Sequence, residues 1–452
     1  MLPFRAGRSA LRQTAGCYTS APMSVAEPSS SSPASPPSSD STGSPASPSA
    51  QIASERKLIF LLACVQFINI VDFMMVMPLG PDFARGLSIP LDRLGLVAGM
   101  YTAAAAVAGL VAAPFLDRFD RRRALIVAML GLVTGTAAGG FATSLVTMLL
   151  ARVIAGAFGG PATALTLSIV TDSVPPERRG KAMGALFGAF SVASVLGVPA
   201  GLRLAQAGDW RTPFFALAAL GVVVAVAAVS VMPPMRGHLN RVKQKVAARG
   251  SSSTFDPAVV LSYVSMAIIM MSTFSVVSNI SAYVQFNLGY RRDRLELLYL
   301  AGGFCSFFAM RLTGRFVDKR GPLPATIIGT AGIASVLLLG LVPQHALIPV
   351  VAIFVGFMTA NPTRVVAVNT LTTRVPAPEV RARFMSRQSA VQHMASAVGA
   401  GVSAWLLHER ADHSLAGMRT LALGAIGLSL ILPFTVTALA RRIAARAQTV
   451  NS

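Results

Sequence analysis

Charged residues are scarce in this chain of 452 residues, of which 13% are Asp, Glu, Lys or Arg and 53% are hydrophobic. Soluble domains carry about a quarter charged residues, so the composition excludes an ordinary water-exposed surface. Acidic residues are the scarcest, 18 against 39 Lys and Arg. An acid that falls inside an apolar stretch is therefore a candidate functional group.

Several catalytic and binding motifs are missing as well. The chain has no phosphate-binding loop, no metal-ligand cluster and no Cys–His arrangement beyond chance. These absences argue against an enzyme and against ATP hydrolysis within the chain. We therefore expect no catalytic residues, no bound metal and no cofactor.

Long apolar runs fill most of the sequence instead. A transmembrane helix needs about 20 apolar residues, and windows of that length identify the candidate spans. The sequence predicts an all-α integral membrane protein with twelve transmembrane helices, at residues 58–80, 94–116, 124–143, 145–171, 181–204, 213–233, 257–286, 295–314, 324–342, 346–371, 384–407 and 416–440.

The net charge of +21 raises the question of a nucleic-acid partner. Most of the Lys and Arg, however, lie at the two ends of the chain and in alternate loops. Basic loops resist translocation, so this bias predicts that both termini and these loops are cytoplasmic. We expect a multi-pass protein of the cell inner (plasma) membrane with no nucleic-acid partner. None of the three cysteines lies in a predicted outer loop, so we expect no structural disulfide.

The N-terminal segment differs in composition from the rest. Residues 24–54 are dominated by Ser, Pro and Ala and bury too little apolar surface to offset the entropy of ordering. We therefore predict a disordered tail over residues 1–54. Residues 1–22 contain Arg5, Arg8 and Arg12 and no acid, like an organellar transit peptide. A start at Met23 is the interpretation that we favour, because the rest of the chain is bacterial in style.

The chain also repeats itself. Helix 2 ends in Leu116-Asp117-Arg118 and helix 8 in Val317-Asp318-Lys319, and the two acids are 201 residues apart. Val-Pro pairs after helices 4 and 10, at 174–175 and 375–376, have the same offset. Two independent matches at one offset predict a duplicated six-helix unit. The predicted division is a tail at 1–54, halves at 55–233 and 257–440, a basic cytoplasmic linker at 234–256 and a cytoplasmic tail at 441–452.

These repeated segments resemble a signature of the major facilitator superfamily, and the resemblance covers essentially all of residues 55–440. The signature between helices 2 and 3 is matched by Asp117, Arg118, Arg121 and Arg122, although Ala113 and Asp120 stand where the family has glycines. The second copy keeps Gly314, Asp318, Lys319 and Gly321. The resemblance implies the fold of that family, with two pseudo-symmetric halves.

Within the superfamily the sequence resembles the drug:proton antiporter-type branch, which includes multidrug exporters and sugar-efflux permeases. This resemblance rests on residues 71–81 in helix 1, on residues 208–211 before helix 6, and on Arg152 followed by Gly156 in helix 4. A shortened form of the helix-5 antiporter motif is present at Gly197, Pro199 and Gly201. The resemblance implies a role for Arg152 in proton coupling.

Asp117 and Asp318 end helices 2 and 8 among basic residues. Acids contribute little to topology, so we interpret both as gating groups that pair with basic neighbours and hold the cytoplasmic side closed. We assign gating to the surrounding basic residues too, with a plain stop-transfer cluster as the alternative: Arg118, Arg121, Arg122 and Lys319.

Asp72 is the one acid well inside a predicted helix. A charge at the centre of a transmembrane helix costs about 2.5–3.5 kcal/mol, which favours a polar cavity, a partner or protonation of the carboxyl. A carboxyl that faces opposite sides in turn can carry a proton, so we predict Asp72 as a proton-coupling residue, with Arg152 beside it in the role that the resemblance implies. The alternatives are a structural, hydrogen-bonded Asp72 and an Arg152 that snorkels to the outer interface.

Three further expectations concern other helices. In helix 5, Gly184 and Gly188 have a spacing that lets helices approach closely. Arg364, near the inner end of helix 10, is expected to snorkel to the interface. Polar residues of helices 1 and 7 are the candidates for the substrate cavity: Gln66, Asn69, Asn279 and Gln285.

The predicted function is secondary active transport by alternating access, as proton-coupled efflux of a small amphipathic or drug-like compound. Proton symport or facilitated uptake of a sugar or organic acid is the first alternative, and a transport-dead membrane receptor or scaffold is the second. The expected partners are the small-molecule substrate, protons and the lipid bilayer, and we expect a monomer.

Overall fold

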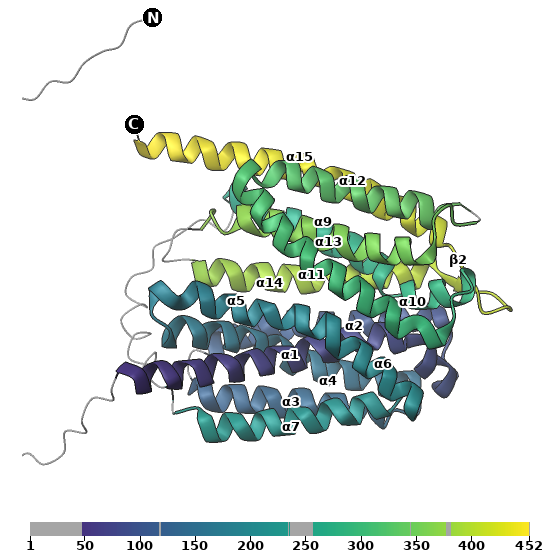
Figure 1. Cartoon of the computed structure of the whole chain (residues 1–452), viewed down its shortest axis with the longest axis horizontal. Helices are drawn as coiled ribbons and strands as arrows, with labels where there is room; N and C mark the ends of the chain where they lie inside the picture. The colour runs from purple at the N-terminus through teal and green to yellow at the C-terminus, as the bar shows by residue number, and fades with distance from the viewer. Residues whose placement is uncertain are drawn as a thin grey trace, which may run out of the picture. The chain divides into compact units, whose positions relative to one another are not determined.

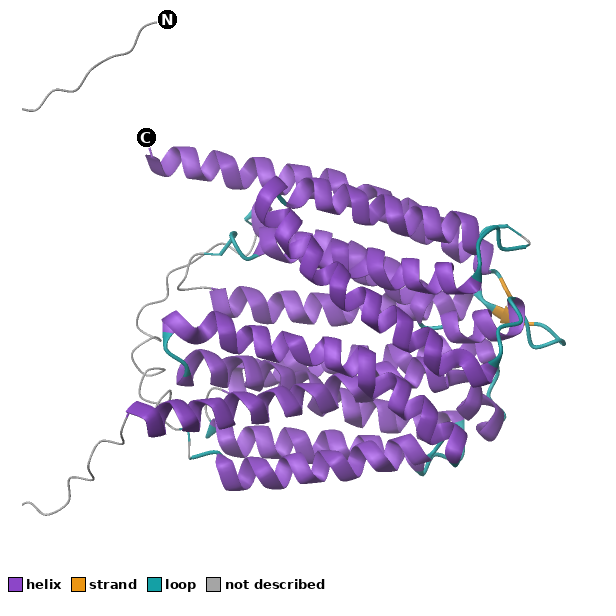
Figure 2. Cartoon of the chain, in the orientation of Figure 1, coloured by secondary structure: helices purple, strands orange, loops and turns teal. Residues whose placement is uncertain are grey.

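The computed structural model describes residues 48–116, 119–233, 235, 256–343, 345–376 and 381–451. The predicted tail as far as residue 47 and most of the predicted linker 234–256 lie outside the described residues. Residues 48–451 belong to one unit, in which long helices run side by side (Figures 1 and 2).

The predicted first half folds into six spans, of which the fifth is interrupted by a π turn. These are α1 (Pro48–Leu87), α2 (Leu94–Leu116) after the 3-10 turn η1 (Leu91–Arg93), α3 (Arg121–Gly140), α4 (Leu145–Ser173), α5 (Pro176–Val192) continued through the π turn η2 (Ala193–Gly197) into α6 (Val198–Ala207), and α7 (Thr212–Val231).

The second half repeats this order, with the break in its first span. Its elements are α9 (Pro257–Val277), α10 (Ile280–Ala282) and the π turn η3 (Tyr283–Asn287), the 3-10 turn η4 (Arg292–Arg294), α11 (Leu295–Arg320), α12 (Pro322–Gly340), α13 (Val350–Thr372), α14 (Arg381–Leu406), the short strands β1 (His408–Glu409) and β2 (Leu415–Ala416), and α15 (Met418–Asn451). The starts of η1 and η4 are 201 residues apart, and so are the starts of α2 and α11. This is the offset found in the sequence.

The twelve predicted spans correspond to twelve helical segments among the described residues. Eleven of them are long and apolar enough to cross a membrane. The remaining one, α14, packs between α2 and α9. Large apolar side chains are exposed on the outside of the bundle, such as Phe60, Trp405 and Phe434. A surface of this kind suits lipid rather than water.

Several helix boundaries differ from those predicted. Helix α1 continues to Leu87 rather than ending at 80, because Pro78 and Pro81 lie inside it without breaking it, as neighbouring helices in membrane proteins permit. Helix α11 continues to Arg320, and α15 runs to Asn451 through the predicted C-terminal tail. Helix α1 begins at Pro48, within the predicted disordered tail.

The two halves meet along small residues. Helix α2 lies against α14, and the segment α5–η2–α6 lies against α11. A Cβ at Gly95 would come within 2.5 Å of the carbonyl oxygen of Ala400, and one at Gly303 within 2.7 Å of that of Ser194. Both glycines therefore allow helix backbones of opposite halves to touch.

Gly184 and Gly188 do not have the packing role that we predicted. A Cβ at either position would meet no described atom within 4 Å. Their spacing of four residues, which is common in close helix contacts, is therefore a misleading signal in α5.

Helix α1 begins and α15 ends at the same end of the bundle (Figure 1). We call this the predicted inner end, because the positive charge bias assigns it to the cytoplasm. The predicted outer end is the opposite one, which carries η1, η4 and the two strands.

Candidate functional site

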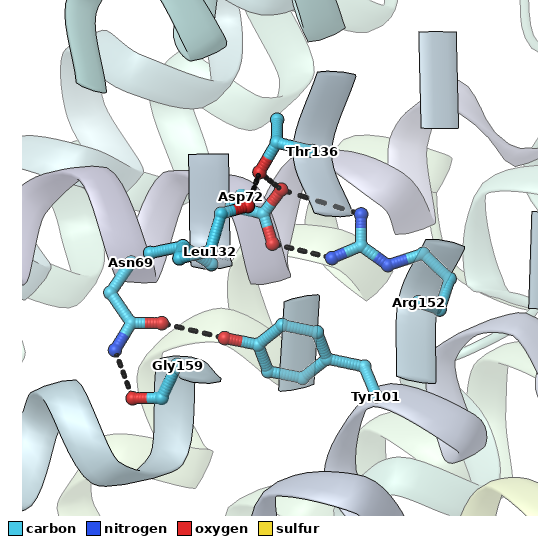
Figure 3. Close-up of polar contacts among 7 residues, drawn as sticks. All are labelled: Asn69, Asp72, Tyr101, Leu132, Thr136, Arg152 and Gly159. Carbon is cyan, nitrogen blue, oxygen red and sulfur yellow. Dashed lines mark hydrogen bonds and ion pairs between the residues drawn. The ribbon is translucent and has the colours of Figure 1, made fainter. Parts of the chain in front are cut away.

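The acid singled out in the sequence lies at the centre of the first half. Asp72 is near the middle of the span Ser54–Leu87 and has no exposed surface. Arg152, two turns into α4, is 1% exposed and forms an ion pair with it. Nη2 of Arg152 donates to Oδ2 of Asp72, and Nη1 lies 3.4 Å from Oδ1 (Figure 3). Arg152 thus does not snorkel to an interface.

Two further helices complete the surroundings of the pair. The hydroxyl of Thr136 in α3 lies 2.7 Å from Oδ1 of Asp72, and 2.9 Å from the carbonyl oxygen of Leu132. The guanidinium of Arg152 lies over the ring of Tyr101 in α2, 5.0 Å from its centroid. Four helices of one half, α1 to α4, therefore each supply one side chain to the site.

Asn69, one turn before Asp72 on α1, connects the site to α4. Its Oδ1 accepts from the Tyr101 hydroxyl at 2.6 Å, and its Nδ2 donates to the carbonyl of Gly159 and to Oγ1 of Thr163, both at 2.7 Å. Figure 3 shows Tyr101 reaching from the Arg152 side of the site to Asn69. Because the amide is fully engaged and 5% exposed, Asn69 positions the helices in this structure.

The glycine at position 156, four residues after Arg152, is explained by the close approach of another helix. A Cβ there would overlap the carbonyl oxygen of Tyr101 and lie 2.9 Å from its carbonyl carbon. Gly160 is similar, with the carbonyl oxygen of Ala105 at 2.7 Å. These glycines let α2 and α4 approach closely, and that approach brings the Tyr101 ring over Arg152.

The electrostatics of the site follow from its burial. A guanidinium cannot lose its proton in a protein, and a buried charge is stable only when it is paired and hydrogen-bonded. Asp72 supplies the negative charge, so the pair is neutral as a unit. Protonation of Asp72 would leave a buried cation without its carboxylate, which is costly unless the helices move and admit water or another anion.

The helix-5 motif lies beside this site. A Cβ at Gly197, the last residue of η2, would overlap a methyl group of Val71, the residue before Asp72. Gly201 is one turn further, with Met75 at 3.9 Å. Pro199 occupies the first turn of α6, where its missing N–H is tolerated. The π turn and Gly197 therefore bring helix 5 close to the functional part of α1.

The gating residues are only partly described. Asp117 and Arg118 lie outside the described residues. Nε of Arg121 pairs with the carboxylate of Asp172, at the end of α4, at 2.8 Å, and Arg122 donates to the carbonyl of Val229 in α7. Asp318 and Lys319 are exposed in the last turn of α11. Their role as a gate stays a prediction.

The cavity candidates of helices 1 and 7 form hydrogen bonds within the protein in this structure, and their role in a substrate cavity stays a prediction. Asn279 is fully buried and donates to the hydroxyl of Ser403 in α14 at 2.7 Å. Gln285 is 9% exposed and donates to the carbonyl of Ser281 in the same helix. Gln66 of α1 is half-buried, and its Oε1 lies 3.3 Å from Oγ1 of Thr166. In this conformation Asn279 and Gln285 face protein rather than open space.

Arg364 contradicts its expected snorkelling, because it has no exposed surface. Its Nη atoms donate to Oγ of Ser272 and Ser429, Oγ1 of Thr273 and Oδ1 of Asn361, at 2.9 to 3.4 Å. The side chain points between α9, α13 and α15. It does not run to the helix end.

Sequence reasoning missed Tyr101 and Thr136 as members of the site. Neither type is rare in membrane helices, and no spacing connects them to Asp72 in the chain. A usable signal for Tyr101 was the set of glycines at 156, 159 and 160 in α4, which marks a face where another helix backbone comes close.

A bundle of membrane-length helices, built from two repeated halves and holding a buried ion pair, defines a polytopic membrane protein. The chain belongs to the Major Facilitator Superfamily, whose model matches residues 62–400. This family is one of transporters rather than of enzymes.

The chain is similar to two kinds of characterised relative. A chloramphenicol resistance protein of Streptomyces lividans is 26% identical over 270 residues, covering 57% of this chain and 65% of the relative. The purine ribonucleoside efflux pump NepI of Escherichia coli O157:H7 is 28% identical over 261 residues, covering 57% of this chain and 63% of the pump. The chain thus spans a little under two thirds of each relative's length.

Solved structures agree on the fold. A bacterial homologue of the human lysosomal transporter Spinster, in an inward-facing and unoccupied conformation, matches with a TM-score of 0.66 and 16% identity, covering 87% of this chain and 98% of that one. The human organic anion transporter MFSD10 (TETRAN) matches with a TM-score of 0.61 and 16% identity, covering 84% and 99%. At this identity the likeness concerns the fold alone.

Proposed function

We propose that the protein is a proton-coupled exporter of small amphipathic compounds, with Asp72 as the proton-carrying group and Arg152 as its partner. The observation that carries this proposal is the ion pair between them, which has almost no exposed surface in the middle of a membrane-spanning bundle. A charged pair at that depth is costly to maintain. A role in which the pair opens and closes accounts for that cost.

The coupling follows from the chemistry of the two groups. Arg152 keeps its charge, whereas Asp72 gains or loses a proton. While the pair is closed, the guanidinium of Arg152 contacts the carboxylate of Asp72. Protonation releases Arg152 and so favours a conformation in which its cation is hydrated or otherwise paired. The proton thereby selects between two arrangements of α1 and α4, as alternating access requires.

Export and the class of substrate rest on the relatives. Both kinds carry names that concern resistance or efflux, one for chloramphenicol and one for purine ribonucleosides. Both compounds are small and combine apolar with polar groups. We place both termini in the cytoplasm of an inner-membrane protein, on the distribution of Lys and Arg.

Transport into inverted membrane vesicles, followed with a proton-sensitive dye, tests the proposal, with chloramphenicol and purine ribonucleosides as the first probes. Asp72→Asn keeps the shape of the side chain but removes its titration. It should abolish uptake against a gradient and leave downhill exchange. Asp72→Glu should retain part of the activity with a shifted pH optimum.

Two controls separate coupling from folding. Asp72→Asn leaves Arg152 buried without its partner, a defect of about 3–5 kcal/mol for a broken buried pair. The double variant Asp72→Asn/Arg152→Gln removes that defect and should accumulate normally in the membrane, still without concentrating substrate. Asp293 is an exposed acid at the predicted outer end of the bundle, and Asp293→Asn should transport as the parent does. If Asp72→Asn concentrates substrate, the proton travels elsewhere and the proposal fails.

A further inference from the structure

Among the residues that the structure describes, three polar contacts join the two halves at the predicted outer end. Their members come from the loops and helix ends on that side. They are the ion pair of Asp82 with Arg292, the hydrogen bond from the backbone N–H of Leu91 to Glu409, and the ion pair of Arg203 with Glu296. Each connects a residue of the first half with one of the second.

The pair of Asp82 and Arg292 has the strongest geometry of the three. Nε of Arg292 lies 2.9 Å from both carboxylate oxygens of Asp82, and Nη2 also donates to Oδ2. Their side chains are 21% and 18% exposed. A bidentate, half-buried arrangement is much stronger than an exposed ion pair. By comparison Arg203 is 72% exposed and 3.5 Å from Glu296, so that pair contributes little.

The first two contacts are related by the internal repeat. Leu91 and Arg292 are the first residues of η1 and η4, 201 positions apart. The N–H of Leu91 has no acceptor within its own turn, because it is at the start of that turn. It donates instead to Oε2 of Glu409 at 2.6 Å. Arg292 uses its side chain instead. The same turn of each half therefore reaches across to the opposite half.

Both contacts border pockets of the outer end. A pocket of about 260 Å³ is lined by Asp82 and Arg292 together with Trp210. A second, of about 470 Å³, is lined by Leu91 and Glu409. Arg85 lines both pockets, and its guanidinium lies 5.5 Å from the ring centroid of Phe286 in the other half. Water at these pockets can solvate the charged groups when they part, so the contacts are strong and yet breakable.

We propose that the Asp82–Arg292 pair, with the Leu91–Glu409 hydrogen bond as its partner, is the latch that holds the outer side of this transporter closed. Alternating access requires the halves to separate at this end once per cycle. The latch must then break, because its members belong to different halves. The assignment does not depend on the coupling ion or on the substrate.

Cysteine accessibility in intact cells tests the latch without a known substrate. The background is the chain with its cysteines replaced, carrying Ile280→Cys. Ile280 is fully buried on α10, the short helix that packs against α1 of the other half. We expect slow reaction of this cysteine with a membrane-impermeant maleimide in the parent. Arg292→Gln should raise the labelling rate several-fold. Arg292→Asp should raise it further, since it sets two acids against each other.

The charge swap Asp82→Arg/Arg292→Asp should return labelling towards the parent rate, a rescue that local damage would not produce. The matched control is the pair of Arg291 and Asp293, 2.6 Å apart but within one half. Both side chains of this control pair are exposed, and Nη2 of Arg291 contacts the carboxylate of Asp293. Asp293→Asn should leave labelling unchanged.

Each variant also needs a check on insertion. Leu347→Cys, 69% exposed in a loop of the outer end, should label quickly in all of them. The assignment is overturned if the swap labels as fast as Arg292→Asp, or if Asp293→Asn opens the outer side as much as Arg292→Gln. It is also overturned if a disulfide between Asp82→Cys and Arg292→Cys leaves the labelling of Ile280→Cys as fast as in Arg292→Gln.

Discussion

Replacing Gly156 by alanine tests whether close approach of α2 and α4 assembles the ion-pair site. The added Cβ would overlap the carbonyl oxygen of Tyr101 and lie 2.9 Å from the carbonyl carbon and 3.0 Å from the Cα. These atoms belong to the backbone of α2, so no rotamer change relieves the overlap. The oxygen would lie 2.2 Å from that Cβ, and Cβ atoms essentially never come within 3.0 Å of another heavy atom, so the two helices must part by roughly 0.8 Å.

That movement acts on the contacts of one aromatic side chain. Tyr101 donates to Asn69 at 2.6 Å and lies under the guanidinium of Arg152 at 5.0 Å. Overpacking of a tight contact costs about 1–3 kcal/mol. We therefore expect a lower midpoint of thermal unfolding for purified Gly156→Ala in detergent, together with slower transport of whichever probe the parent accepts.

Gly184→Ala and Gly188→Ala are the matched controls, because a Cβ at either position meets no described atom within 4 Å. Alanine is the better helix former by up to about 1 kcal/mol, so neither control should lose stability. Midpoints are to be compared at one heating rate, since membrane proteins unfold irreversibly. If Gly156→Ala unfolds at the same temperature as these controls and transports normally, close approach is not what builds the site.

Two further predictions concern the other half and the topology. Arg364→Met should retain most of the stability of the parent, because replacing a buried cation by an apolar group of similar volume is often neutral. Arg364→Lys should be less stable, because the charge stays while the planar fork of donors is lost. The prediction is contradicted if Arg364→Lys has the same midpoint of thermal unfolding as the parent while Arg364→Met has a much lower one. Lys243→Cys, in the predicted inner linker, should resist impermeant maleimide in intact cells and react after permeabilisation. Fast labelling of Lys243→Cys in intact cells would show that the predicted topology is inverted.

The fold was accessible from the sequence because apolar runs and the repeat are local signals. Starts of helices such as Leu94 and Leu145 were predicted at the observed residue. The predicted end of α1 was wrong. Pro78 and Pro81 indicate a helix end in a soluble protein, but they are tolerated inside a membrane helix where neighbouring helices supply the contacts. That error placed Asp82 in a loop and hid it as a partner for the other half.

The candidate site was accessible only in part. Asp72 and Arg152 were found because charge inside an apolar helix is rare and costly. Their contact, and the contributions of Tyr101 and Thr136, depend on how four helices pack, which no spacing along the chain encodes. Arg364 was misplaced for the same reason. The short distance of Arg364 from the end of its helix suggests snorkelling. Its hydrogen-bond acceptors Ser272 and Ser429, however, belong to other helices and cannot be read from that distance.

The two halves have diverged at the level of the ion pair, which bears on the coupling role that we propose for the first half. The repeat offset of 201 places Thr273 where the first half has Asp72. Thr273 accepts from Arg364 at 3.2 Å, so the second half holds an arginine among neutral acceptors and offers no carboxylate there. An arginine cannot release its proton, so Arg364 cannot take the part that we propose for Asp72. Asp82, ten residues beyond Asp72 on α1, lies about 15 Å further along the same helix. Helix α1 therefore supplies the acid of both ion pairs, one within the first half and one between the halves.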